Sequence, residues 1–235
     1  MLEYLTSAGI VILVLALVCG IGALVLKLMF KERKERQARC AALAALGFQD
    51  CPERANDLEQ LLRFLCGVED GGALPYSVSM PMRLEQRGET IYHLWIKRTS
   101  GGDSGSAWEE TFLFPFKRPA EQPVMLMMSS QKVPAKLMKF LGGLLERALG
   151  GRLALLELPR ELQGGGIAAA FGPPGATLYE LLDSSTISEI LRGADLGAAN
   201  FRAHRDWAAI SADPRKGAAD LAPLWGHVER LAALR

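Results

Sequence analysis

A run of 19 uncharged residues near the N-terminus constrains this chain more than any other feature. It extends from Ala8 to Leu26, reads AGIVILVLALVCGIGALVL, and is followed directly by KLMFKERKER. A helix rises about 1.5 Å per residue, so the run would span roughly 28 Å, close to the roughly 30 Å hydrocarbon core of a bilayer. A helix also satisfies its own backbone hydrogen bonds, as hydrocarbon requires. The run therefore predicts a single transmembrane helix, within a membrane anchor of residues 1–30.

The charges beside the run predict its orientation. Glu3 is the only charged side chain before it, whereas a basic neck follows it. Because an excess of Lys and Arg favours the cytoplasmic side, we expect the N-terminus outside and the rest of the chain in the cytoplasm. The expected location is the inner (cytoplasmic) membrane of the cell. The basic side chains that we expect at the membrane surface, near anionic lipid headgroups, are Lys27, Lys31, Arg33, Lys34, Arg36 and Arg39.

Three other interpretations of the run fit the residues less well. A cleaved signal peptide has a basic N-terminal region, and this chain has Glu3 there with no Lys or Arg. A lipidated cysteine at Cys19 would follow small residues, whereas Leu17 and Val18 precede it. A buried core helix rarely contains an uncharged run of this length. The transmembrane interpretation is therefore preferred.

Small residues four positions apart in the run predict a helix-packing face. Ala16 and Gly20 have this spacing, and so do Cys19 and Ala23. Small side chains allow a second helix to approach closely. The run would then pack against a partner helix or a second copy of the chain. The alternative is that alanine and glycine are simply common in isolated anchors.

The composition excludes some classes of function. The chain has 27 Lys and Arg against 26 Asp and Glu, for a net charge of +1. Because the basic residues concentrate in the neck, the remainder is close to neutral, which argues against nucleic-acid binding. The four cysteines show no C-x-x-C spacing and no histidine spacing that would indicate zinc; they are Cys19, Cys40, Cys51 and Cys66. We therefore predict no metal and no cofactor.

Residue patterns after the anchor predict a helical neck and one α+β domain. Residues 31–47 are good helix formers, which end at Gly47. Residues 48–235 form the domain; two similar halves that divide near residue 150 are an alternative arrangement. A helix is predicted at Cys51–Cys66, with Asp50 and Glu53 as a capping box. The last helix is predicted to begin after Asp220, as its N-cap.

Alternating and short apolar segments predict the strands of an antiparallel sheet. The first pair flanks a turn at Arg87-Gly88, and GGDSGS at 101–106 is a predicted flexible loop. The predicted strands are Pro75–Gln86, Thr90–Thr99, Trp108–Phe116, Val124–Met128, Arg152–Leu158, Ile167–Phe171, Ala198–Ala203 and Trp207–Ser211. Turns are predicted at Lys117–Pro123 and His204–Asp206, and helical segments at Ala135–Leu149, Leu178–Leu182 and Ile187–Leu191. Strands grouped in hairpins between helices favour an α+β fold with packed helices.

The methionine-rich segment Val124–Met128 has two interpretations. An adaptable partner surface is one, because methionine adjusts to irregular contacts. A central strand that is covered on both faces is the other, and we favour it.

The sequence predicts no catalytic residue and no cofactor-binding residue. Gly172–Thr177 reads GPPGAT and resembles the opening of a phosphate-binding loop, but Leu178 stands where the lysine is required. We therefore predict a turn there. Glu109 and Glu110 are neighbours on a strand, so alternation directs one of them away from the core. His204–Asp206 contains three residue types found in catalysis, but neighbours in a turn point apart.

These patterns favour a non-enzymatic function. The leading hypothesis is a single-pass membrane protein whose cytoplasmic domain is a protein-interaction, accessory or assembly module, with the lipid bilayer and a protein or second copy as partners. The alternative is a membrane-tethered enzyme or small-ligand sensor, whose deep pocket would gather several of the residues His93, Arg98, Glu109, Glu110 and His204. A third hypothesis is a lipid-surface module acting through the neck. The layout resembles that of many bacterial membrane-anchored domains, without a motif specific enough to name a family.

Overall fold

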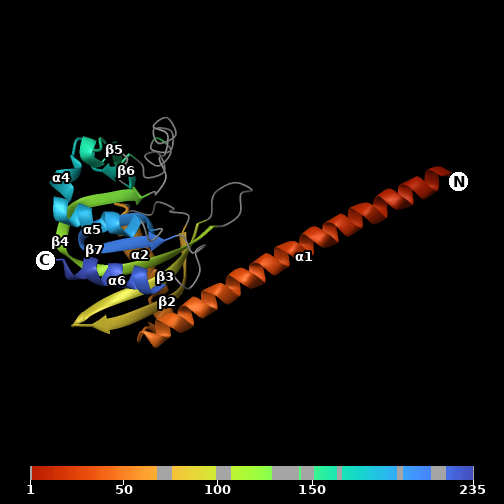
Figure 1. The fold of residues 1–235 in the computed structure, drawn as a ribbon, viewed down its shortest axis with the longest axis horizontal. Helices are drawn as coiled ribbons and strands as arrows, with labels where there is room; N and C mark the ends of the chain where they lie inside the picture. The colour runs from red at the N-terminus through yellow and green to blue at the C-terminus, as the bar shows by residue number, and fades with distance from the viewer. Residues whose placement is uncertain are drawn as a thin grey trace. The chain divides into compact units, whose positions relative to one another are not determined.

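The computed structural model describes residues 2–67, 76–98, 107–128, 143, 151–162, 166–194, 198–212 and 221–234. The chain divides into two units, Met1–Leu46 and Gly47–Arg235. The first unit is one long helix, α1 (Leu2–Ala45) (Figure 1). Gly47 follows it with φ +99°, a left-handed conformation that glycine adopts readily. The predicted end of the neck helix at Gly47 is therefore confirmed.

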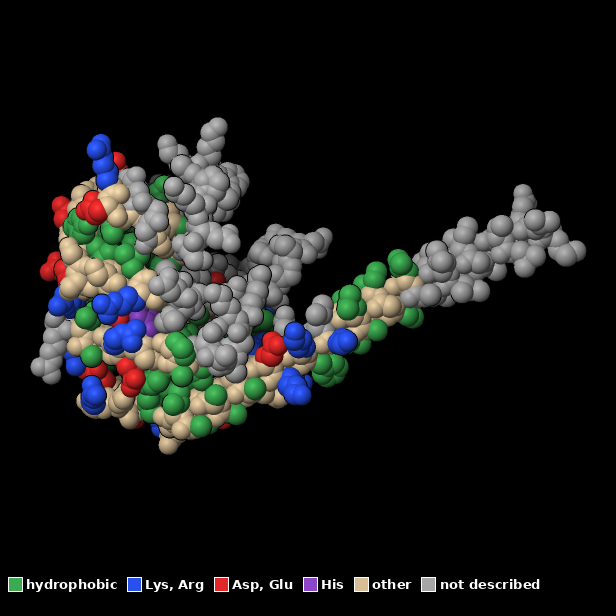
Figure 2. Space-filling view, viewed as in Figure 1, with side chains coloured by type: hydrophobic (Ala, Val, Ile, Leu, Met, Phe, Trp, Pro, Cys, Tyr) green, Lys and Arg blue, Asp and Glu red, His purple; other side chains and the backbone are tan. Residues whose placement is uncertain are grey.

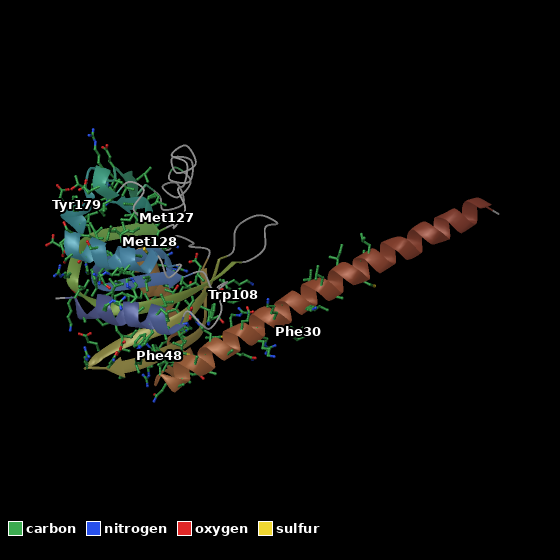
Figure 3. All side chains as sticks on the ribbon, in the orientation of Figure 1. Phe30, Phe48, Trp108, Met127, Met128 and Tyr179 are labelled. Carbon is green, nitrogen blue, oxygen red and sulfur yellow. The ribbon has the colours of Figure 1, made fainter. Side chains whose placement is uncertain are left out.

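The structure describes the side chains of only part of the predicted transmembrane run. Side chains of residues 2–16 lie outside the described ones, so the first part of the run, Ala8–Ala16, is not described beyond its helical backbone. Among the residues that are described, no helix is long and apolar enough to cross a membrane. Among the described side chains of α1, eight large apolar ones are exposed, six in the run and two just after it: Leu17, Val18, Ile21, Leu24, Val25, Leu26, Met29 and Phe30. Phe30 projects outward from the helix (Figure 3).

The second unit is built on an antiparallel sheet, which confirms the predicted α+β class. In the described part of the chain, seven strands pair in the order β1-β2-β3-β4-β6-β5, with β7 on β4. The strands are β1 (Gln49–Asp50), β2 (Tyr76–Gln86), β3 (Glu89–Arg98), β4 (Ala107–Met128), β5 (Ala154–Leu156), β6 (Ile167–Gly172) and β7 (Ala198–Ala212). All of their pairings are antiparallel. Strands from before and after residue 150 thus belong to one sheet.

Two long strands replace the short ones that the sequence predicts. Residues 117–123 are not a turn, because β4 continues through them, and residues 204–206 are not a turn, because β7 does the same. The two strands stay paired because the register between them is irregular. The pairing of β4 with β7 shifts between Pro115 and Ala120 and again before Val124. Arg205 has φ +51° at the matching bend of β7. Such bulges bend a strand and accommodate proline without ending the sheet.

The helices follow the sequence pattern more closely than the strands do. They are η1 (Pro52–Arg54), α2 (Ala55–Leu65), η2 (Arg160–Leu162), α4 (Leu178–Leu181), α5 (Ser184–Ala194) and α6 (Leu221–Ala233). The predicted capping box at Asp50 and Glu53 is wrong, because Asp50 pairs with Met82 in the sheet and the cap residue Cys51 makes no side-chain hydrogen bond. The predicted loop at 101–106, the helix at 135–149 and the cap at Asp220 lie outside the described residues.

Helices cover both faces of the sheet. On one face, α2 packs its leucines on β3, β4 and β7; this cluster is Leu58, Leu62, Leu65, Leu94, Ile96, Leu113 and Ala209. On the other face, Trp225 of α6 packs edge to face with Phe48, with ring centroids 5.2 Å apart, and also contacts Phe112. Helices α5 and α6 lie side by side (Figure 1). Consecutive residues of the central strands are therefore buried on opposite faces.

The methionine-rich segment belongs to this covered centre. Met125 and Met128 are buried, and Met125 packs in a second cluster with Phe171 and Cys66. Figure 3 shows Met127 and Met128 within the domain. The interpretation as a central strand is confirmed.

Candidate functional site

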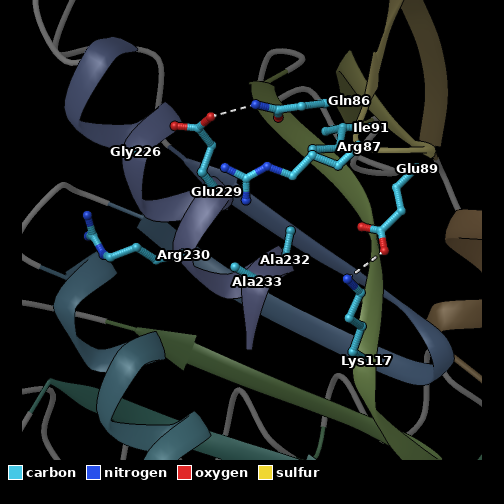
Figure 4. Close-up of a pocket in the computed structure, with 10 residues that line it drawn as sticks. All are labelled: Gln86, Arg87, Glu89, Ile91, Lys117, Gly226, Glu229, Arg230, Ala232 and Ala233. Atoms are coloured by element: carbon cyan, nitrogen blue, oxygen red, sulfur yellow. Dashed lines mark hydrogen bonds and ion pairs between the residues drawn. The ribbon is translucent and has the colours of Figure 1, made fainter. Parts of the chain in front are cut away.

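A hollow of about 560 Å³ opens beside α6, within the usual size range of ligand pockets. The end of β2, the β2–β3 turn, the start of β3, the middle of β4 and the second half of α6 line it (Figure 4). The lining side chains are Gln86, Arg87, Glu89, Ile91, Lys117, Gly226, Glu229, Arg230, Ala232 and Ala233. Three strands, one helix and the β2–β3 turn thus bring polar and charged side chains to one surface depression.

Ion pairs and hydrogen bonds order this lining. Lys117 Nζ lies 2.8 Å from Glu89 Oε1, and Gln86 Nε2 donates to Glu229 Oε1 over 3.0 Å (Figure 4). Arg230 Nε donates to Oε1 of Glu189 on α5 over 2.7 Å. These contacts tie α6 to both the sheet and the neighbouring helix.

Glu189 is the centre of a polar network between α5 and α6. Arg192 Nη1 donates to its Oε2 over 2.8 Å, and Arg230 binds its Oε1. His227 Nδ1 lies 3.5 Å from that same Oε1, and the His227 side chain is fully buried. Gly193 makes room for this ring, because a Cβ at that position would lie 2.6 Å from His227 Nε2. Burial lowers the pKa of His227 from its ordinary value, and nearby Glu189 opposes this only in part.

A second buried pair lies under α6. His93 Nε2 and Glu110 Oε1 are 3.0 Å apart, with side-chain exposures of 0% and 1%. The rings of Phe112, Trp95 and Phe48 surround His93, with centroids 5.0, 6.0 and 6.5 Å away. No substrate can reach a pair that is this deeply enclosed, so we assign it to the core.

Of the five residues named for a possible enzyme or sensor pocket, the described part of the structure brings only His93 and Glu110 together. His204 lies against α2, where its Nδ1–H donates to the Phe64 carbonyl oxygen over 2.9 Å. Its ring also stacks on the Phe64 ring at 4.1 Å. Glu109 is half-buried on the face opposite Glu110, and the Arg98 side chain lies outside the described residues.

The glycine- and proline-rich segment 172–177 is a turn, as predicted. Gly175 has φ +86°, and Thr177 then caps α4. The Thr177 backbone N–H donates to Glu180 Oε2 over 2.7 Å, which completes a capping box. The segment therefore forms the turn that precedes α4 and supplies its N-cap.

The residues predicted at the membrane surface lie on α1. Lys27, Lys31, Arg33 and Lys34 are exposed, Arg36 is half-buried, and Arg39 is buried. Of the predicted helix-packing residues, Cys19, Gly20 and Ala23 are exposed, and the Ala16 side chain lies outside the described residues. Lipid contact and helix packing at these positions stay predictions.

No pattern in the sequence predicts the lining of the hollow as a whole. Arg87 offered one signal, because an arginine seldom occupies the first position of a two-residue hairpin turn. Glu189, Arg230 and His227 offered none, since α5 and α6 are distant in sequence. Within the described residues, no three His, Cys, Asp or Glu side chains lie close enough together to hold a metal ion.

Comparisons with known proteins add a structural likeness. No protein-family model and no curated protein matches the chain. Among solved structures, it is similar to the crystal structure of the mycobacterial trehalose monomycolate transport factor A, TtfA. The sequence identity is 11%, the TM-score is 0.45, and the likeness covers 85% of this chain and 93% of that chain.

Replacing one partner of the buried His93–Glu110 pair should destabilise the full chain strongly. We expect Glu110→Leu to lower the free energy of unfolding by about 3 kcal/mol, because it leaves the His93 ring buried without its bond. The double variant His93→Leu with Glu110→Leu should lose less than the sum of the two single variants. Urea unfolding in mild detergent, followed by tryptophan fluorescence, measures these values. Additive single effects would contradict the assigned pairing.

Stability should fall below neutral pH because of His227. In the unfolded chain this histidine takes up a proton near pH 6.5, whereas burial lowers its pKa in the folded chain. Between these two values the unfolded state binds more protons, so the free energy of unfolding decreases as the pH falls, by at most about 1.4 kcal/mol per pH unit. Urea unfolding from pH 7.5 to 5.0 should show a smaller decrease in His227→Gln. Equal slopes in the two proteins would argue against this origin.

Proposed function

We propose that this chain is a single-pass membrane protein whose α+β domain binds another protein at the membrane surface. The run Ala8–Leu26 is the anchor, the N-terminus lies outside, and the domain lies in the cytoplasm. The location that fits this arrangement is the inner (cytoplasmic) membrane. The observation that supports it most is the exposure of large apolar side chains on α1.

The distribution of these side chains around α1 favours lipid as their cover. Each of the eight, between Leu17 and Phe30, exposes between 48% and 68% of its surface. At about 100° per residue, they cover roughly 240° of the helix circumference. A helix that packs on one protein surface has an apolar stripe of about 100°. Figure 2 shows this apolar segment followed by Lys and Arg side chains.

The basic side chains of α1 support the proposed orientation. Four basic side chains on the domain side of the run are exposed, namely Lys27, Lys31, Arg33 and Lys34. Exposed ammonium and guanidinium groups can reach anionic headgroups, at about 1 kcal/mol each. Lys and Arg beside a span also favour the cytoplasmic side.

The proposed interaction role rests on the hollow beside α6. It is an open depression with charged side chains from several elements, which suits recognition of polar groups on a partner. By contrast, the buried pair His93–Glu110 and the network around Glu189 bond parts of the domain to one another. The hollow is thus the best-supported place for a partner to bind the domain.

Charges placed in the anchor should release the chain from membranes. In Val18→Arg with Ile21→Arg, each arginine would cost roughly 3 kcal/mol at the centre of the span. We expect the wild-type chain to stay with the membrane pellet after an alkaline carbonate wash, and this variant to appear in the supernatant. Val18→Leu with Ile21→Leu is the matched control and should stay in the pellet. Release of the wild-type chain by the wash would overturn the proposed anchor.

A partner should co-purify with the chain through its domain. We expect the full chain, extracted in mild detergent after cross-linking in cells, to elute with a second protein or a second copy in a fixed ratio. Gly20→Leu tests the anchor's contribution, because leucine blocks close helix packing. Retention of the partner by Gly20→Leu assigns binding to the domain. Repeated recovery of the chain alone, as a monomer, would count against the interaction role.

A further inference from the structure

Arg87 adopts a backbone conformation that arginine seldom adopts. It has φ +55°, and Gly88 beside it has φ +79°. Two successive positive φ values in a two-residue hairpin define a turn that favours asparagine, aspartate or glycine. Arg87 is exposed, so packing does not require a long side chain there. A strained residue that the fold does not need is an indication that its side chain serves another purpose.

The Arg87 side chain extends across the hollow toward α6 (Figure 4). The other two cations of the lining have carboxylate partners: Lys117 pairs with Glu89, and Arg230 with Glu189. In the described part of the chain, no carboxylate lies within 4.0 Å of a guanidinium nitrogen of Arg87. Its donors are therefore available to a group that enters from outside.

The wall opposite Arg87 leaves room for such a group. Gly226, Ala232 and Ala233 present small surfaces on α6. A Cβ added at Gly226 would meet only an Nη atom of Arg230, at 3.8 Å. The C-terminal end of α6, which is the negative end of the helix dipole, lies near the hollow. Attraction for an anion must therefore come from side chains. The lining supplies three cations and two carboxylates.

We propose that this hollow binds a carboxylate of a partner polypeptide, with Arg87 as the principal contact and Lys117 as a second cation. This inference rests on the proposed protein-interaction function and names the chemistry of the partner. The planar guanidinium presents paired N–H donors that match the two oxygens of a carboxylate. Either the C-terminal carboxylate of the partner or an Asp or Glu side chain would supply the same group.

Arg87→Asn separates binding from stability. Asparagine suits the turn, so the unfolding midpoint of the full chain should stay the same or rise. Calorimetric titration of the full chain in mild detergent would use three peptides: acetyl-pentaalanine with a free C-terminus, acetyl-Ala-Ala-Glu-Ala-Ala amide, and acetyl-pentaalanine amide. We expect one of the two carboxylate peptides to bind at least tenfold more tightly than the neutral amide, which identifies the source of the group. Arg87→Asn should lose at least tenfold of that affinity.

Two further variants test whether the loss of peptide binding is specific to the cations of the hollow. Lys117→Gln should weaken binding of the same peptide, though by less than Arg87→Asn does. Arg54→Gln removes an exposed arginine that is not part of the hollow lining, and this variant should bind like the wild type. Equal binding of the carboxylate and amide peptides, or full binding by Arg87→Asn, would overturn the carboxylate proposal. If the chain still co-purifies with a partner under those outcomes, the interaction function stands without this site.

Discussion

The pairing of β4 along both of its edges is the constraint on which the rest of the domain depends. One edge pairs with β3 at its first end and with β6 at its last, while the other edge pairs with β7 from Glu110 to Met127. Because β4 is central, its consecutive side chains are buried on opposite faces. Phe112 thus supports α6, and Leu113 supports α2. The two buried polar residues of β4, Glu110 and Thr111, are bonded within the sheet to His93 and Ser211.

Local patterns in the sequence were sufficient for some of this fold. The Arg87-Gly88 turn and the end of α1 at Gly47 both follow from neighbouring residues. The lengths of β4 and β7 do not follow from neighbouring residues. Prolines and polar residues at 117–123, and charged residues at 204–206, indicate turns when only local propensity is considered. Pairing between the two strands overrides that preference, because matching bends at Pro115–Val124 and Arg205 keep the ladder together.

The candidate site depends on register and helix packing, which one sequence does not reveal. His93 lies opposite Phe112 in the β3–β4 pairing, and this register puts Glu110 diagonally within reach. A shift of one residue would have placed the two side chains on opposite faces. The Glu189 network likewise requires α5 and α6 to lie side by side. Of the residues of the site, only Arg87 is distinguished in the sequence itself, because its turn does not favour arginine.

The long β4–β7 ladder also has a consequence for the order of synthesis. Thr111 and Ser211 are bonded partners but lie 100 positions apart in the chain. At roughly 5–20 residues per second, β4 leaves the ribosome on the order of 5–20 s before β7 can pair with it. During that interval, a 22-residue strand has one edge without its final neighbour. A nascent chain in this state is exposed to strand-to-strand aggregation, so chaperone protection would be needed most just before β7 is made.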